Sequence, residues 1–409
     1  MPTKTAQPKT NLIPKLRFSG FSDGPASAKA EAGNWEEKKL GEVCDYKNGG
    51  AFENNLVENG KYNLITLNSI DIDGKLKSFH KTVGKADWYL KKDDLVMVLS
   101  DVAHGNFLGL VDVIPEDNKY VLNQRMGLLR KTDEQVNLSF LRTFVNKSQR
   151  YFKLHGQGSS QQNLSKGDIL KFKIVTPSLP EQQKIAGFLG AVDGWIENLR
   201  GQKESLTLYK KGMMQKIFPS KGGQVSEIRF KDDKGKNFPD WEEKKLGSVL
   251  DYEQPTDYIV ESTEYDDEYK IPVLTAGKTF VLGYTNETKG IFENGKLPVI
   301  IFDDFTTASQ FVDFAFKVKS SAMKILTAKS DTNIRFIYEA MQLIKYEVGG
   351  HGRHWISKFS SIKMLIPSLL EQQKIADFLT SLDKVIESKQ QQITHAEQWK
   401  KGLMQGLFV

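Results

Sequence analysis

The stretch that decides the fold is PSLPEQQKIAGFL, residues 177–189, because the chain contains it twice. It returns as PSLLEQQKIADFL at 367–379, with 11 of the 13 positions identical at an offset of 190. A shorter repeat, WEEKKLG, occupies 35–41 and 241–247. Self-similarity at so long a period indicates duplication, so the 409 residues are predicted to form two copies of one unit.

Each 13-residue block is predicted to begin a helix. Ser178 with Glu181, and Ser368 with Glu371, have the spacing of a capping box, in which the serine hydroxyl and the glutamate carboxylate satisfy free backbone N–H groups. Apolar residues then recur at steps of three and four, which predicts one apolar stripe along each helix.

The two predicted helices cover residues 178–218 and 368–409, and such a helix spans roughly 55 Å at ~1.5 Å per residue. A stripe of this length is most simply buried by a second helix of the same kind, so we expect the two to pair as an antiparallel coiled coil. The residues predicted to pack there are Ile185, Phe188, Leu189, Val192, Ile196, Leu199, Ile375, Phe378, Leu379, Leu382, Ile386 and Ile393.

Glycine is frequent in the first of these helices and weakens it in isolation, by up to ~1 kcal/mol at each exposed position. Glycine also permits close approach of a second helix, which we consider as its role here. The positions are Gly187, Gly190, Gly194, Gly201 and Gly212.

The segments before the helices have short β-type runs separated by turn signals, which is typical of α+β globular domains. The predicted organisation has a flexible tail (1–16), a first domain (17–177), a linker (219–228) and a second domain (229–367), with a long helix after each domain. The fold class is α+β with a pseudo-two-fold internal repeat. The edges of the two domains repeat but their middles hardly match, which suggests one scaffold with two recognition surfaces.

Composition sets few limits. The net charge of +6 permits an anionic partner without requiring one. A single cysteine, Cys44, excludes an internal disulfide and a cysteine-based zinc site, and it fits a reducing cytoplasm. We see no apolar run of about 18 residues and no signal peptide, so we expect a cytoplasmic protein that does not contact membranes.

Motifs for catalysis fail on inspection. The segment 277–279, GKT, resembles the end of a phosphate-binding loop, but Pro272 stands where that loop needs glycine. Asp240 with the following E-x-K triplet lacks the wider spacing of a nuclease, and no Pro-Pro pair of an amino-methyltransferase occurs. His351 and His354 have no carboxylate or cysteine at metal-site spacing. We therefore predict no catalytic residue, no metal and no cofactor bound by this chain.

Two polar loops, 156–163 and 349–355, occur at matching places just upstream of each long helix, and together with further polar residues elsewhere in each domain they supply the candidates for DNA contact. Glycine lets a backbone approach a phosphate, and amide and guanidinium groups can read base edges. The candidates in the first half are Lys47, Asn48, Asn123, Gln124, Arg125, Gln157, Ser159, Ser160, Gln161 and Gln162. Those in the second half are Thr275, Lys278, Thr279, Thr306, Thr307, His351, Arg353 and His354.

These features together resemble the specificity (S) subunit of type I restriction-modification enzymes, above all through the repeated PSLxEQQKIA block before a long amphipathic helix. The resemblance covers almost the whole chain after residue 16. It implies that each domain reads half of a split double-stranded DNA site, and that the helices fix the gap. It also implies that the helix residues named above dock two modification (M) subunits.

The same resemblance implies that cofactors belong to the partners. The M subunits would carry S-adenosylmethionine and methylate adenine-N6 in each half-site, and restriction (R) subunits would use ATP and Mg. Residues 250–326 look like a widespread recognition-domain type, for which we expect the half-site GAA. Two alternatives stay open: a single-chain DNA methyltransferase or nuclease, and a non-catalytic coiled-coil scaffold.

Overall fold

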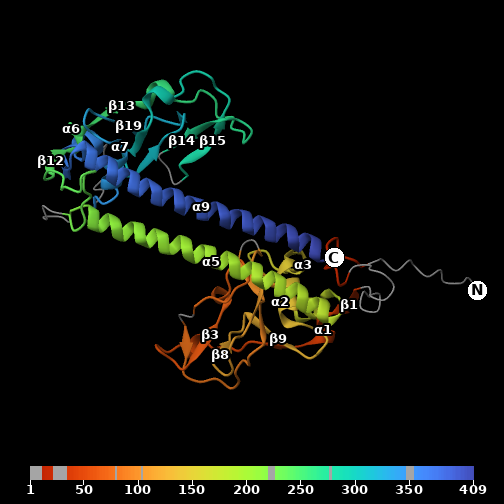
Figure 1. The fold of residues 1–409 in the computed structure, drawn as a ribbon. Helices are drawn as coiled ribbons and strands as arrows, with labels where there is room; N and C mark the ends of the chain where they lie inside the picture. The colour runs from red at the N-terminus through yellow and green to blue at the C-terminus, as the bar shows by residue number, and fades with distance from the viewer. Residues whose placement is uncertain are drawn as a thin grey trace, which may run out of the picture. The chain divides into compact units, whose positions relative to one another are not determined.

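Two helices of 39 residues each, α5 (Leu179–Ile217) and α9 (Leu369–Leu407), organise the chain (Figure 1). The computed structural model describes residues 12–21, 35–78, 81–102, 105–219, 226–275, 279–346 and 354–409. The chain divides into unit 1 (Met1–Asn198 with Gln392–Val409) and unit 2 (Leu199–Gln391), so each unit contains part of both helices.

In its described residues, unit 1 is built on four sheets and four short α-helices. Two of the sheets are strand pairs: β1 (Glu36–Lys39) with β11 (Lys173–Thr176), and β6 (Ser100–Val102) with β10 (Gln161–Asn163). The four-stranded antiparallel sheet has the order β2 (Cys44–Asn48), β9 (Met126–Lys131), β5 (Leu95–Val98), β7 (Val111–Val113), and the three-stranded sheet has the order β4 (Thr82–Val83), β3 (Tyr62–Ile65), β8 (Tyr120–Leu122), with β3 and β8 parallel. The helices are α1 (Leu40–Val43), α2 (Leu138–Lys147), α3 (Gln149–His155) and α4 (Lys166–Leu170).

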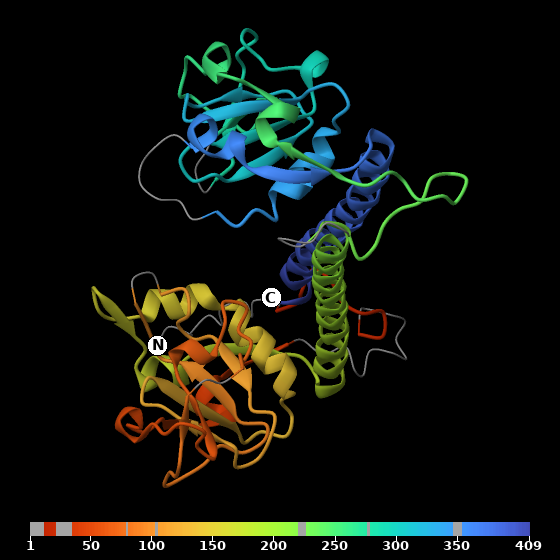
Figure 2. The same ribbon diagram turned by 90° about the vertical axis from the view of Figure 1, so that its left-hand side faces the viewer.

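Unit 2 repeats the three principal sheets of unit 1, strand for strand. Figure 2 shows the sheets of unit 2 in teal and blue and those of unit 1 in orange and yellow. The strand pair is β12 (Glu242–Lys245) with β20 (Lys363–Ile366). The four-stranded sheet has the order β13 (Leu250–Glu253), β19 (Met323–Ala328), β16 (Val299–Asp303), β17 (Ser309–Val312), and the three-stranded sheet has the order β15 (Val281–Thr285), β14 (Ile271–Leu274), β18 (Lys317–Val318), with β14 and β18 parallel. The helices are α6 (Leu246–Val249), α7 (Ile334–Met341) and α8 (His354–Ser357). The α+β prediction with an internal repeat is confirmed, and the dissimilar middles share one topology.

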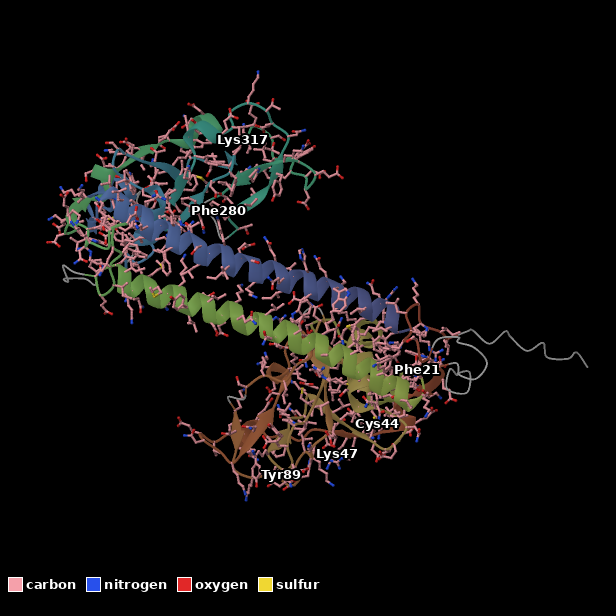
Figure 3. All side chains as sticks on the ribbon, in the orientation of Figure 1. Phe21, Cys44, Lys47, Tyr89, Phe280 and Lys317 are labelled. Carbon is pink, nitrogen blue, oxygen red and sulfur yellow. The ribbon has the colours of Figure 1, made fainter. Side chains whose placement is uncertain are left out.

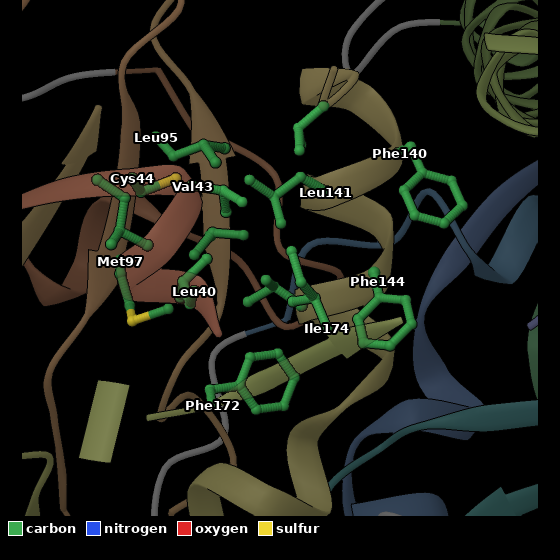
Figure 4. Close-up of a cluster of buried hydrophobic side chains, with 14 of the residues drawn as sticks. Leu40, Val43, Cys44, Leu95, Met97, Phe140, Leu141, Phe144, Phe172 and Ile174 are labelled. Atoms are coloured by element: carbon green, nitrogen blue, oxygen red, sulfur yellow. The ribbon is translucent and has the colours of Figure 1, made fainter. Parts of the chain in front are cut away.

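The four-stranded sheet of each unit is covered on both faces, which explains why its central strand is apolar throughout. In β5, Leu95 and Met97 face the core that contains α2, while Val96 and Val98 face a second core. Figure 4 shows the first of these cores. Burial there raises the pKa of the Cys44 thiol to about 12, so this cysteine stays neutral and unreactive.

The helices pair antiparallel within each unit, as predicted. In unit 1, Lys400 Nζ lies 2.6 Å from Asp193 Oδ1. In unit 2, Lys203 Nζ donates to Gln390 Oε1 at 2.6 Å, and Lys210 binds Asp383 at 2.8 Å. As residue numbers rise along α5, the numbers of the bonded residues on α9 fall, so the two helices run in opposite directions. Among the twelve predicted packing positions, Phe188, Phe378, Leu382 and Ile386 are half-buried and the other eight are buried.

The glycines of α5 do not serve close packing, contrary to our expectation. A Cβ atom placed at any of the five positions would have no described atom within 4 Å outside the local helix backbone. These glycines therefore weaken the helix without a compensating contact in the described chain.

The glutamates of both predicted capping boxes bind arginine side chains, and the box predicted at Ser368 is wrong. Glu181, 1% exposed, accepts from Arg17 Nε and Nη2 at 2.7 and 2.8 Å. Glu371 accepts from Arg229 Nε and Nη2 at 3.1 and 2.7 Å. The Oγ atom of Ser368 has no hydrogen-bond partner among the described residues. A bidentate guanidinium–carboxylate pair is stronger than a neutral capping bond, so it prevails.

The glutamine after each glutamate joins the helix to its domain. Gln182 accepts from the backbone N of Asn137 at 2.8 Å and donates to the carbonyls of Gln135 and Pro177. Asn137 in turn caps α2 by accepting from Phe140 N. The equivalent bonds of Gln372 go to Asn333, Asp331 and Pro367, and Asn333 caps α7.

The end of each long helix closes the unit in which it lies. Phe408 packs on Trp35 and Phe140 in unit 1. In unit 2 the equivalent contacts join Phe218 to Trp241 and Phe336. The two tryptophans come from the WEEKKLG repeat, so both copies of this repeat have the same packing role.

The chain entering each domain also bonds to a helix end. Leu16 N donates to Gly406 O at 2.8 Å in unit 1, and Ile228 N donates to Lys216 O at 3.1 Å in unit 2. Of the tail predicted over 1–16, the structure describes residues 12–16, and Leu12 packs against the core of unit 1. The linker predicted over 219–228 is described at residue 219 and from residue 226.

Candidate nucleic-acid interface

One edge of unit 1 collects loops from several strands. The strands β2 and β5 end where β9 and β7 begin, since Asn48 pairs with Gly127 and Met97 with Val111. The end of β3 joins them, because Asn123 N donates to Ile65 O at 2.9 Å. We call the described residues of 47–50, 99–110, 123–125 and 156–163 the first polar edge.

The first polar edge brings together all ten candidates predicted in the first half. Lys47, labelled in Figure 3, holds its Nζ 4.0 Å from the centre of the Trp88 ring. Gln161 and Gln162 are half-buried in β10, which pairs with β6 directly after β5. Asn123 is only 3% exposed and its Nδ2 donates to Glu53 Oε1, so its amide faces protein. The exposed candidates are Lys47, Asn48, Gln124, Arg125, Gln157, Ser159 and Ser160.

The corresponding edge of unit 2 gathers five of its eight candidates. We call the described residues of 253–254, 275–280, 303–308, 319–322 and 354–355 the second polar edge. Thr306 is exposed and Thr307 half-buried between β16 and β17, while Thr279 is exposed and Thr275 half-buried after β14. The backbone N of Thr275 donates to the carbonyl of Phe280, which Figure 3 labels. Lys278, His351 and Arg353 lie outside the described residues.

His354 does not present its ring to solvent. It is 2% exposed, and Nδ1 lies 3.4 Å from the hydroxyl of Tyr346. The two rings pack edge to face with centres 5.7 Å apart. His354 therefore supports the edge from inside, because aromatic packing outweighed the polar character that made it a candidate.

The two predicted polar loops end at the same place in the fold. Leu164 N donates to Leu99 O in unit 1, and His354 N donates to Asp304 O in unit 2, each at 2.9 Å. Leu99 N and Asp304 N themselves donate to carbonyls of the turns before β9 and β19. One backbone frame thus carries polar loops of unrelated sequence.

Sequence reasoning missed the aromatic side chains that lie under one lysine of the first polar edge and under another just after this edge in the chain. Trp88 lies beneath Lys47, and Tyr46 lies 5.9 Å from the Nζ of Lys166, the first residue of α4. Burial raises the pKa of Tyr46 to about 12, so its hydroxyl stays protonated and able to donate. Because Lys47 and Trp88 belong to different segments, no local pattern announced this pair.

Other kinds of site find little support in the described part of the chain. No three His, Cys, Asp or Glu residues come together there as a metal site. None of the described helices is both long enough and apolar enough to cross a membrane.

Two domains of one topology with two different polar edges define a class of recognition protein with paired reading surfaces. The family model for the type I restriction modification DNA specificity domain matches residues 32–208 and 239–398, so the chain belongs to this family. Both matched ranges include a domain and most of its long helix.

Individual relatives agree with this assignment. The chain is 55% identical over 126 residues to the EcoR124I/EcoR124II specificity subunit of Escherichia coli, a match that covers 30% of this chain and 31% of that protein. It is 24% identical over 399 residues to the MjaVIII specificity subunit of Methanocaldococcus jannaschii, covering 91% of each. The chain therefore spans about a third of the first relative and most of the second.

A solved structure shows the same fold. The type I S subunit of M. genitalium superposes with a TM-score of 0.64 at 16% identity, covering 97% of this chain and 99% of that one. At this identity the likeness concerns the fold alone.

Proposed function

We propose that this chain is the DNA sequence-specificity subunit of a type I restriction-modification complex, with one half of a bipartite site read at each polar edge. The observation that carries the proposal is the contrast within the repeat. Each helix is held to its domain by a latch, which we define as the arginine–glutamate pair (Arg17–Glu181 or Arg229–Glu371) with the hydrogen bonds of the following glutamine (Gln182 or Gln372). The latches are the same in both units, whereas the residues on the two edges differ. A scaffold kept constant under two different surfaces fits recognition of two different half-sites.

The long helices supply the spacing and the docking surfaces in this proposal. Most of the predicted stripe is buried between helices and domains, so docking of two M subunits falls to the exposed faces. Large apolar side chains are exposed there: Trp195 and Trp399 at 48% each, Tyr209 at 51% and Leu208 at 61%. One solved relative, with a TM-score of 0.51, is titled for complex assembly of the type I system, which supports such partners.

The chemistry is assigned to the partners. The M subunits hold S-adenosylmethionine and methylate adenine, and the R subunits use ATP and Mg. This chain would then be non-catalytic and would bind none of these groups. Binding of S-adenosylmethionine to the purified chain alone would instead favour the single-chain methyltransferase.

The decisive experiment maps N6-methyladenine across the genome of cells that express this chain with its M subunit. We expect a split motif with a fixed gap, whereas a continuous motif would contradict the proposal. Exchange of residues 229–367 for another such domain should change one half only, and GAA is our proposal for the half it reads. Insertion of four residues into both helices should lengthen the gap by about two base pairs, since a helical turn adds ~6 Å.

A coiled-coil scaffold makes a different prediction from the same exchange. It requires no dependence on DNA sequence, so the methylated motif would not follow the exchanged domain. The exchange therefore separates the scaffold from the specificity subunit.

A further inference from the structure

The turn 303–308 joins β16 to β17 on the second polar edge, and one buried carboxylate organises it. Asp303, 6% exposed, accepts from the backbone N of Phe305 at 2.9 Å and of Thr306 at 3.2 Å, and from Thr306 Oγ at 2.6 Å. Its own backbone N and O bond to Ala308 and Thr307. The turn is therefore shaped before any ligand arrives.

The backbone of this turn is strained. Thr307 has φ +62°, in the left-handed region that a β-branched residue rarely adopts. Such conformations cost about 1–3 kcal/mol and persist where surrounding bonds impose them, which occurs most often at functional sites. The base of the turn is anchored as well, because Asp304 Oδ1 accepts from Trp355 N at 2.8 Å.

The turn presents an exposed apolar ring beside polar side chains. Phe305 is 40% exposed and the following Thr306 is also exposed. Since more than half of the phenylalanine is covered, the ring cannot insert fully between base pairs, as a wedge residue does. Its free part suits an edge contact, and the apolar group on the base edges of the major groove is the thymine methyl.

We propose that Phe305 is a specificity-determining residue that reads a thymine methyl in one half-site, and that Asp303 is the residue that positions it. This inference rests on the proposed function of unit 2. At the equivalent positions in the described chain, unit 1 has neither the buried carboxylate nor the exposed ring. Val98 pairs with Met126 at the start of β9, and Asp303 pairs with Met323 at the start of β19, so Val98 is the residue equivalent to Asp303. Two positions further on, Ser100 is therefore equivalent to Phe305. The thymine contact therefore belongs to unit 2 alone.

The chain offers a matched control. Phe314 has the same exposed fraction, 40%, in the same unit. It follows the end of β17, where Val312 pairs with Val299 at the start of β16, so it lies at the opposite edge of the sheet. The variants Phe305→Ala and Phe314→Ala thus remove equal rings from opposite edges.

The first test maps the methylated motif of each variant, co-expressed with the M subunit. Phe305→Ala should relax one base pair of the half-site assigned to unit 2 by domain exchange, and leave the other half unchanged. Phe314→Ala should keep the wild-type motif. An unrelaxed motif in Phe305→Ala, or equal relaxation in both variants, overturns the inference.

The second test measures binding of the assembled complex to the mapped site with single thymines replaced by deoxyuridine, which lacks only the methyl group. The wild type should lose affinity about fourfold at one position, the effect of one buried methyl-sized group. The Phe305→Ala complex should show no such loss. A wild type that is indifferent to every replacement overturns the inference.

Asp303 is tested by the same readouts. Asp303→Ala should relax the same base pair as Phe305→Ala, whereas Asp303→Asn keeps an oxygen acceptor for the two backbone N–H groups and should restore discrimination. Relaxation at other positions would contradict a positioning role. If domain exchange moves neither half of the motif, the proposed function fails first, and that outcome is distinct from all of these.

Discussion

At the residue scale, the repeated Glu-Gln-Gln is a latch rather than a cap. Its spacing after serine was a reasonable local signal, but Arg17 is 164 positions from Glu181 and no local pattern could reveal it. The same holds for Lys47 and Trp88. The sequence predicted the candidate polar residues, but contacts between residues far apart in the chain, such as these two pairs, became visible only in the folded structure.

The latch leads to a stability prediction. Glu371 is fully buried against Arg229, so Glu371→Ala should lower the free energy of unfolding by about 2 kcal/mol, because the guanidinium loses its bidentate partner and keeps only Asp240 at 3.6 Å and two backbone carbonyls. Chemical denaturation followed by tryptophan fluorescence measures this change. Glu387→Ala, an exposed position of the same helix, should change the value by less than about 0.5 kcal/mol. Equal effects of the two substitutions would argue against the latch.

At the element scale, the helices were predicted closely and the sheets were not. The Ser-x-x-Glu spacing placed both helix starts within one residue, and the apolar stripe predicted that each helix is long, since both signals depend on neighbours along the chain. The pairing of β1 with β11 joins the two ends of a domain, and only packing decides it. The residues predicted to contact DNA in the first half all lie on the first polar edge, because loops between strands of one sheet meet there, and their contact with DNA stays a prediction.

The exposed glycines of α5 give an element-scale prediction. Replacing Gly190, Gly194 and Gly201 by alanine should stabilise the chain by up to ~1 kcal/mol each, because nothing described meets the new Cβ atom. Thermal unfolding of the purified chain checks this. The contrasting control is Gly49→Ala, whose Cβ would lie 1.9 Å from the carbonyl oxygen of Asn123 and should destabilise. A loss of stability in the triple variant would contradict the assignment.

At the scale of the whole molecule, the two units are closed by equivalent bonds. Leu16 N donates to Gly406 O in unit 1, and Ile228 N donates to Lys216 O in unit 2. The same backbone hydrogen bond therefore occurs in unit 1 and beside the linker predicted over 219–228. The duplication seen in the sequence predicted two like units. That they are closed in the same way became visible only in three dimensions.

A circular permutant tests this equivalence. Joining Val409 to Leu12 through a copy of residues 219–227, and opening the chain between Gly222 and Gly223, should preserve the methylated motif and the unfolding midpoint. Opening between Ile300 and Ile301, inside a buried strand, should abolish both. If the first permutant fails to fold, the ends of unit 1 are not interchangeable with the linker.

The duplicated latch also bears on inheritance. The Glu-Gln-Gln of each latch is encoded in one of two nearly identical stretches of the gene, and the residues of each polar edge are encoded upstream of one of these stretches. A single crossover within such a stretch can join one half of this chain to the other half from another gene while leaving the Glu-Gln-Gln in place. New half-site combinations can therefore arise in one event, without a period of compensating mutation.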